Sequence, residues 1–223
     1  EELNTYTFRN FYNGAGVGIG DFNNDGLQDI YFCGNTASNK LYLNNGKFQF
    51  QDITDKAGVA CNNVWSTGVS IVDINADGWM DIYVCKSGPN KSSNRHNELF
   101  INNGDLTFSE KSKDYGLDIL GLSVHATFFD YDRDGDLDCY LLNNSFKSIE
   151  AFDPQKDIRL IPDPEGANML LRNDARHFVN ATLEAGIYSS KVGFGLGATV
   201  SDINNDDWPD IYISNDFFEK DYL

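Results

Sequence analysis

Long apolar runs, paired cysteines and basic residues are all scarce in this chain of 223 residues. It contains no stretch of about 18 apolar residues, so a membrane-spanning helix is not expected. It neither begins with Met nor carries a visible signal peptide, so we expect a mature or trimmed product that has lost any targeting segment. Only 17 basic residues accompany 34 acidic ones, and this net charge of −17 argues against a nucleic-acid-binding protein.

Cysteine and helical signals are also limited. The four cysteines are Cys33, Cys61, Cys85 and Cys139, and the absence of a CxxC pair argues against a zinc ribbon. Buried thiols and one disulfide both stay open, and the sequence does not determine a connectivity. No long amphipathic pattern with a helical period is present.

The acidic residues are concentrated, since 15 of the 34 lie in four segments that align without gaps. We name these segments loop 1 (residues 21–29, DFNNDGLQD), loop 2 (73–81, DINADGWMD), loop 3 (130–138, DYDRDGDLD) and loop 4 (202–210, DINNDDWPD). A short apolar run follows each loop, at residues 30–33, 82–85, 139–142 and 211–213. A glycine-rich or apolar stretch precedes each one.

A second motif follows the first three loops: NKLYLNNG (39–46), NELFINNG (97–104) and NMLLRNDA (168–175). Asn-Gly between apolar runs predicts a hairpin, because both residues tolerate positive φ. A further strand and a turn such as Ala57-Gly-Val59 come next. Each repeat is thus predicted to form four short antiparallel strands, as in the blade of a β-propeller.

The predicted fold is therefore all-β: a single, incomplete propeller over residues 1–223, with about 3.5–4 blades. Its repeats span approximately residues 14–60, 61–117, 118–188 and 189–223. Residues 5–12 resemble the last strand of a preceding blade. Either further blades lie outside this chain, or its open strand edges pair with a neighbouring chain.

The repeats differ in length at one connection. The distance from the hairpin motif to the next loop is 34, 33 and 34 residues, whereas the distance from a loop to its hairpin motif is 10, 16 and 30. Repeat proteins place such insertions on one face, which often binds a partner. The longest insertion, near residues 145–167, is predicted to be a loop; it is either a specificity element or a passive spacer.

The loops predict calcium sites. Calcium takes six to eight oxygen ligands, which oxygens at positions 1, 3, 5 and 9 and the carbonyl of position 7 can supply. The predicted ligands are Asp21, Asn23, Asp25, Leu27 and Asp29 in loop 1, Asp73, Asn75, Asp77, Trp79 and Asp81 in loop 2, Asp130, Asp132, Asp134, Asp136 and Asp138 in loop 3, and Asp202, Asn204, Asp206, Trp208 and Asp210 in loop 4.

Position 6 should tolerate a left-handed conformation, which suits Gly26, Gly78 and Gly135. Asp207 occupies it in loop 4, so we expect that site to survive in weakened form. An EF-hand needs Glu at position 12, where these repeats carry apolar residues. The alternative of solvated turns rich in Asp and Asn does not explain four copies in one frame, and magnesium demands stricter geometry.

Extracellular calcium modules bind with Kd of about 0.1–1 mM. Millimolar calcium would then add roughly 0.4–1.4 kcal/mol per site. Sites this weak stay empty at cytosolic calcium, so we expect an extracellular or cell-surface protein.

These motifs resemble the FG-GAP/VCBS repeat family, which includes the integrin α-subunit propeller and the ASPIC/UnbV (cartilage acidic protein) type. The resemblance rests on residues 18–30, their three counterparts and the hairpin motifs, and covers nearly the whole chain. It implies a seven-bladed propeller in the complete protein, calcium in the loops between the first two strands of a blade, and an extracellular setting. Asp207 and the small number of blades depart from that pattern.

No catalytic motif stands out, so an enzyme is not expected. His125, on the strand before loop 3, is either a packing residue or faces a ligand. The main hypothesis is a calcium-dependent module for adhesion, binding a protein or glycan on the insertion face. The alternatives are a structural subunit that self-associates through open strand edges, and a polysaccharide lyase or hydrolase on a propeller scaffold.

Overall fold

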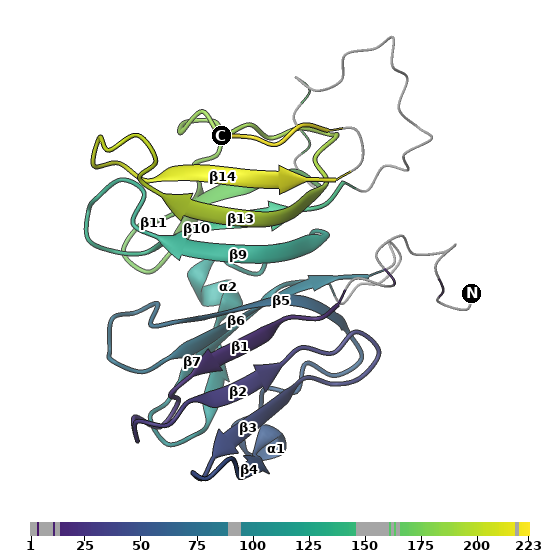
Figure 1. The fold of residues 1–223 in the computed structure, drawn as a ribbon, viewed down its shortest axis with the longest axis vertical. Coiled ribbons are helices and arrows are strands. Elements are labelled where there is room, and N and C mark those ends of the chain that lie inside the picture. Colours follow the sequence, from purple (N-terminus) through teal and green to yellow (C-terminus); the bar gives the residue numbers. More distant parts are fainter. Residues whose placement is uncertain are drawn as a thin grey trace. The chain divides into compact units, whose positions relative to one another are not determined.

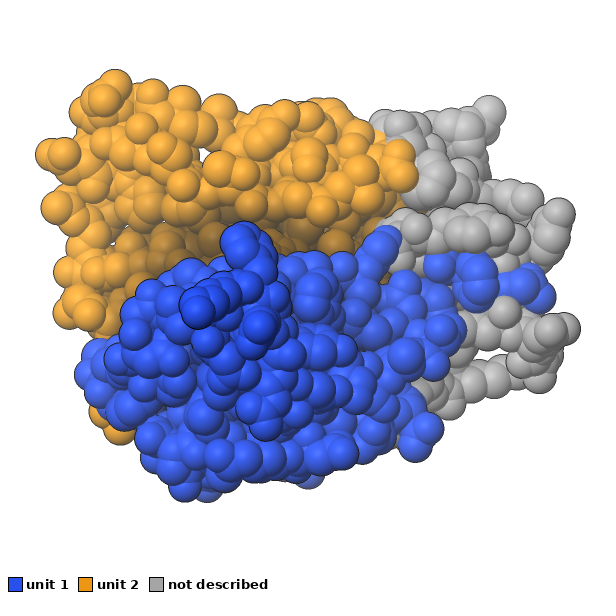
Figure 2. Space-filling view, turned by 60° about the horizontal axis from the view of Figure 1, so that its bottom comes forward, with its two compact units in different colours: residues 1–119 blue, residues 120–223 orange. Residues whose placement is uncertain are grey.

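The computed structural model describes residues 4, 11, 14–88, 95–145, 161, 163, 166–216 and 219–223. They form short antiparallel sheets, with each strand paired to its sequence neighbour (Figure 1). The chain divides into two compact units, residues 1–119 and 120–223, which Figure 2 colours separately. Unit 1 contains loops 1 and 2, and unit 2 contains loops 3 and 4.

Unit 1 holds two four-stranded sheets. The first consists of β1 (Val17–Gly20), β2 (Asp29–Phe32), β3 (Lys40–Asn44) and β4 (Phe50–Asp52). The second consists of β5 (Trp65–Val72), β6 (Asp81–Ser87), β7 (Glu98–Asn102) and β8 (Phe108–Glu110). Both have the strand order of the chain, so each repeat folds as a meander of local hairpins.

Unit 2 holds a third four-stranded sheet and a two-stranded one. The four-stranded sheet consists of β9 (Ser123–Phe129), β10 (Asp138–Asn143), β11 (Met169–Asn173) and β12 (Phe178–Asn180). The other consists of β13 (Gly195–Ser201) and β14 (Asp210–Asn215), and Tyr222 forms a β-bridge with Ile213. The all-β fold with four-stranded antiparallel repeats is confirmed, and its open sheets are consistent with an incomplete propeller. The single domain and the repeat boundaries stay predictions.

Two short helices, α1 (Thr54–Ala57) and α2 (Ser112–Tyr115), follow the fourth strands of unit 1. The sequence predicts only turns here, because four residues are too few to show a helical period. Gly58 (φ 78°) and Gly116 (φ 72°) end them in the left-handed conformation typical of a helix C-terminus. No helix in the described part of the chain is long and apolar enough to cross a membrane.

The glycines before loop 1 let two sheets of unit 1 approach closely. A Cβ on Gly18 would lie 2.7 Å from Ile71 Cδ1, and one on Gly20 would lie 2.6 Å from Ile71 Cγ2. β1 therefore lies against β5. The apolar core of unit 1 is shared by both sheets and includes buried Phe22, Tyr31, Leu41, Ile82, Val84 and Phe100.

A buried tyrosine and asparagine recur as a pair in both sheets of unit 1. Asn39 Nδ2 donates to Tyr31 Oη (2.8 Å), which donates to the Val59 carbonyl (2.7 Å). Asn97 Nδ2 donates in the same way to Tyr83 Oη (3.0 Å), which donates to the Leu117 carbonyl (3.0 Å). Each pair holds the turn after the fourth strand against the interior of the sheet.

All four cysteines lie in the described part of the chain, and all are thiols rather than disulfides. Cys33, Cys85 and Cys139 are buried, and Cys61 is half-buried. Burial raises the pKa of Cys33 to about 12 and that of Cys61 well above its usual value. Of the two open alternatives, the structure therefore shows thiols, three of them buried and one half-buried.

Candidate metal centre

Each aspartate loop connects the first two strands of its sheet, as between β1 and β2 or between β9 and β10 (Figure 1). The loop is closed by its own carboxylates. In all four loops the Asp at position 1 accepts hydrogen bonds from the backbone N–H groups of positions 5 and 6, at 2.7–3.1 Å. The Asp at position 5 accepts from the N–H of position 7 at 2.8–3.1 Å.

The turn requires positive φ at position 6, as predicted. Gly26, Gly78 and Gly135 have φ of 84°, 89° and 100°, and Asp207 has φ of 69°. Asp207 keeps the same backbone hydrogen bond to Asp202 that glycine makes in the other loops (3.0 Å). Loop 4 therefore has the shape of the other loops despite the substitution.

Position 9 fastens the loop to the sheet. In loops 1, 2 and 3 the aspartate at position 9 (Asp29, Asp81 and Asp138) is fully buried. Its Oδ2 accepts a hydrogen bond from the backbone N–H of position 2 of the same loop. Its Oδ1 accepts one from the backbone N–H of an asparagine at the end of the third strand. Burial raises the pKa of Asp81 to about 7 and of Asp138 to about 6, with smaller contributions from neighbouring aspartates. A bound cation would offset this cost of holding buried negative charge.

In loops 1, 2 and 4 the side chain at position 3 forms a hydrogen bond within its own loop. Asn23, Asn75 and Asn204 each donate from Nδ2 to the Oδ2 of the Asp at position 5, at 2.9 Å. Loop 3 has Asp132 at this position. A carboxylate has no proton to donate at neutral pH, so this hydrogen bond is lost and a fifth negative charge enters the loop.

Loop 3 consequently gathers acidic oxygens. Carboxylate oxygens of Asp130, Asp132 and Asp138 all lie within 4.8 Å of one another. Among the described residues, Asp132 Oδ1 and Asp136 Oδ1 are buried and accept no hydrogen bond. Buried acceptors without donors are costly unless a cation meets them. The donor set consists of oxygen atoms alone, which fits calcium or magnesium rather than a soft transition metal.

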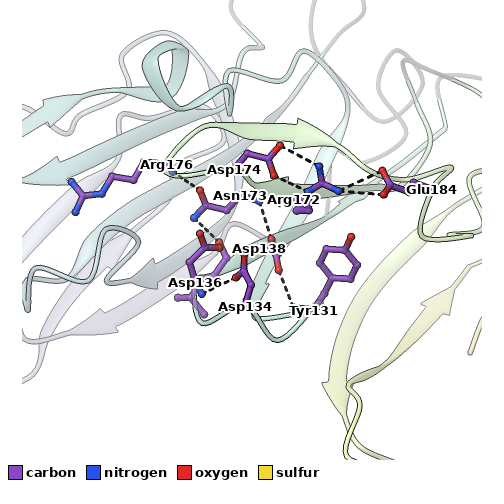
Figure 3. A network of polar contacts seen from close by, with 10 residues as sticks. Tyr131, Asp134, Asp136, Asp138, Arg172, Asn173, Asp174, Arg176 and Glu184 are labelled. Atoms are coloured by element: carbon purple, nitrogen blue, oxygen red, sulfur yellow. Dashed lines mark hydrogen bonds and ion pairs between the residues drawn. The ribbon is translucent and has the colours of Figure 1, made fainter.

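The hairpin beside loop 3 adds a polar network (Figure 3). Asn173 N–H donates to Asp138 Oδ1 (2.8 Å), and Asn173 Oδ1 accepts from the Arg176 N–H (2.7 Å). Arg172 lies between Asp174 and Glu184, with its Nε 2.7 Å from Asp174 Oδ1. This exposed ion pair contributes little stability, but Asn173 ties the hairpin directly to the candidate ligand Asp138.

The sequence interpretation missed three residues of this site: Asn44, Asn102 and Asn173. They are the asparagines that hold position 9 in place. The repeated Asn at the end of each hairpin motif was a usable signal, but it reads equally well as a turn residue. The ligand roles of positions 1, 3, 5, 7 and 9 stay predictions in all four loops. The longest insertion, near residues 145–167, lies mostly outside the described residues.

His125 lies on β9, opposite Leu142 of β10. Burial lowers its pKa, so the ring is neutral at physiological pH. This position is compatible with a packing role.

Comparisons with known proteins agree with the repeat pattern of the chain. Residues 21–84 match the family described as FG-GAP-like repeat. The chain is 26% identical over 96% of its length to cartilage acidic protein 1 of Xenopus tropicalis, and 25% identical over 91% to the mouse and human proteins of that name. It spans only 28–30% of the length of these relatives. The resemblance of this chain to the FG-GAP repeat family, predicted from its aspartate loops, is thereby confirmed.

Proposed function

We propose that this chain is a calcium-binding repeat module of an extracellular β-propeller, and that it serves to bind a protein or glycan partner. One observation carries the calcium part: loop 3 gathers the oxygens of Asp130, Asp132 and Asp138 within 4.8 Å of one another. The same loop holds two buried carboxylate oxygens, of Asp132 and Asp136, without a hydrogen-bond donor among the described residues. A divalent cation would satisfy both features together.

Calcium is favoured over magnesium by the ligand set. The loops offer many protein oxygens at adaptable distances, whereas magnesium keeps several waters and a strict octahedron. The chemistry supplied is structural: an ion would hold positions 1, 3, 5 and 9 together and thereby fix the connection between the first two strands. The chain's own contribution is the backbone arrangement that already aims these carboxylates inward.

The related proteins favour an extracellular setting. Extracellular calcium modules bind with Kd of about 0.1–1 mM, so loops of that class would fill at extracellular rather than at cytosolic calcium. The related proteins are named for cartilage and for acidic character. A partner would bind at the face that carries the insertions between loops and hairpins, where the repeats differ most in length.

Equilibrium dialysis with radioactive calcium tests the proposal. At about 5 mM calcium, above the expected Kd range, we expect four ions per wild-type chain. The double variant Asp130→Ala/Asp134→Ala should bind three. The matched control, Asp55→Ala/Asp105→Ala, removes two exposed carboxylates outside the loops and should still bind four.

Two results would contradict the calcium assignment. One is fewer than two bound ions in a folded wild-type chain. The other is equal displacement of calcium by magnesium at the same concentration, which would mean that the loops are unselective anionic turns.

A further inference from the structure

Loops 1 and 2 contact each other within unit 1. Asn24, at position 4 of loop 1, donates from Nδ2 to the carbonyl of Gly78, at position 6 of loop 2 (3.1 Å). The residue at position 4 of loop 3 behaves similarly in unit 2, where the Arg133 guanidinium lies 5.3 Å from the ring centre of Trp208 in loop 4. Position 4 of one loop thus reaches the next loop in both units.

A second and more buried connection runs through Asn102, which is 3% exposed. Its side-chain Nδ2 donates to the Phe22 carbonyl in loop 1 (2.9 Å) and to the Met80 carbonyl in loop 2 (3.2 Å). Its backbone N–H donates to Asp81 Oδ1 (2.8 Å), at position 9 of loop 2. One residue therefore holds the backbone of both loops and a candidate ligand of the second.

The equivalent residue of the first sheet provides an internal comparison. Asn44 N–H donates to Asp29 Oδ1 (2.8 Å), and Asn44 Nδ2 donates to the Gln28 carbonyl (3.0 Å). Both contacts lie in loop 1 alone. The hairpin asparagine thus has a local role that recurs, and Asn102 adds to it a bond to the preceding loop.

We propose that Asn102 is a positioning residue that couples the two cation sites of unit 1, so that filling loop 2 raises the affinity of loop 1. Asp81 and the Met80 carbonyl orient Asn102, and both would be held more firmly if loop 2 bound a cation. Asn102 then holds the Phe22 carbonyl, which belongs to the peptide bond between Phe22 and the predicted ligand Asn23, while the Phe22 N–H donates to Asp29 (3.0 Å). Such coupling is reciprocal, so filling loop 1 would raise the affinity of loop 2 by the same factor. This proposal rests on the proposed calcium binding.

NMR of the position 6 glycines tests the coupling. The amides of Gly26, Gly78 and Gly135 donate to the position 1 carboxylates, so each reports calcium in its own loop during a titration. Asp77→Ala, which removes a ligand from loop 2, should raise the calcium midpoint of Gly26 by about fivefold or more, the usual lower range of coupling. Asp134→Ala, in loop 3 of the other unit, is the matched control and should leave it unchanged within twofold.

The role of Asn102 is tested by the same titration in a second background. With Asn102→Ala, the Asp77→Ala change should no longer move the Gly26 midpoint, whereas Asn44→Ala should preserve the effect. If Asn102→Ala fails to fold, Asn102→Ser takes its place, because it also removes the Nδ2 donor to Phe22 and Met80 but keeps a polar side chain, and it should likewise abolish the effect.

The outcomes separate this inference from the calcium proposal. Normal titration of Gly26 and Gly78 with no effect of Asp77→Ala on Gly26 would overturn the coupling and leave calcium binding intact. An effect that persists in the folded Asn102 variant would refute the assignment to Asn102. Glycine amides that do not respond to calcium at all would refute calcium binding itself.

Discussion

Single residues decide how well each loop closes. Asp207 at position 6 of loop 4 has φ of 69°. This angle lies in the left-handed region, where residues other than glycine are strained. The loop keeps its hydrogen bonds because Asp is among the few residues that visit this region. The same position in the other loops is glycine with φ between 84° and 100°.

We predict that Asp207→Gly stabilises the protein by about 1 kcal/mol, because it removes a left-handed side chain without removing a predicted ligand. Urea unfolding in the presence of chelator measures this gain. Gly78→Asp, the reverse change in loop 2, should cost a similar amount. Equal stability of all three proteins would mean that position 6 carries no strain.

Substitution of Asp132 should stabilise the protein without calcium but weaken calcium binding. Without calcium, Asp132→Asn restores the amide donor that the other loops possess and removes one of five negative charges, so we expect a gain of about 1 kcal/mol. With calcium, the same variant should bind about fivefold more weakly, since it loses a charged ligand. Thermal melting with chelator and a calcium titration measure the two effects. A variant in which stability without calcium and calcium affinity both rise, or both fall, would contradict the proposed role of Asp132 in loop 3.

In both sheets of unit 1, asparagines hold the third strand at both of its ends. Asn39 and Asn97 begin the hairpin motif and bond buried tyrosines, while Asn44 and Asn102 end it and bond position 9 of a loop. These hydrogen bonds fix the position of the hairpin relative to the loop and to the turn after the fourth strand. The sheet can therefore keep the same geometry although the insertions differ in length.

We predict that Tyr83→Phe lowers the free energy of unfolding by about 1–3 kcal/mol, because it leaves the Leu117 carbonyl and the Asn97 amide without their buried partner. Tyr42→Phe, at a half-buried tyrosine of β3 that packs edge-on against Phe32, is the control and should change stability by less than about 0.5 kcal/mol. Denaturant titration compares the two. A cost for Tyr83→Phe no larger than the control would indicate that the recurring pair is not structural.

At the scale of the whole molecule, charge is the dominant feature. Four calcium ions would bring eight positive charges and change the net charge from −17 to −9. At millimolar calcium and Kd of about 0.1–1 mM, four sites contribute roughly 2–6 kcal/mol in total. A contribution of that size is comparable to the whole stability of a domain.

We therefore predict that chelator lowers the melting temperature by roughly 4–24 °C, taking about 2–4 °C per kcal/mol for a chain of this size. Calorimetry with calcium, with chelator and with magnesium measures the shift. A control protein with position 1 of each loop changed to alanine should melt at the same temperature in all three. A wild-type melting temperature that chelator leaves unmoved would remove the structural role of calcium.

Features that depend only on near neighbours in the chain can be read from the sequence. Nine residues are enough to encode a loop in which carboxylates at positions 1 and 5 accept hydrogen bonds from the loop's own backbone. Gly26, Gly78 and Gly135 indicate where the backbone adopts positive φ. The hairpin motifs likewise predict their strands. These features depend on neighbours a few residues away, so a repeated pattern is sufficient to read them.

Features that depend on residues far apart in the chain become visible only in the folded protein. The bond from Asn102 to Phe22 joins positions 80 residues apart, and the glycines of β1 have their purpose only because β5 lies against them. The buried acceptor oxygens of loop 3 also follow from packing, since the sequence shows five aspartates but not which of their oxygens lose contact with water. Burial and partners arise from how sheets pack, and no pattern within one repeat records them.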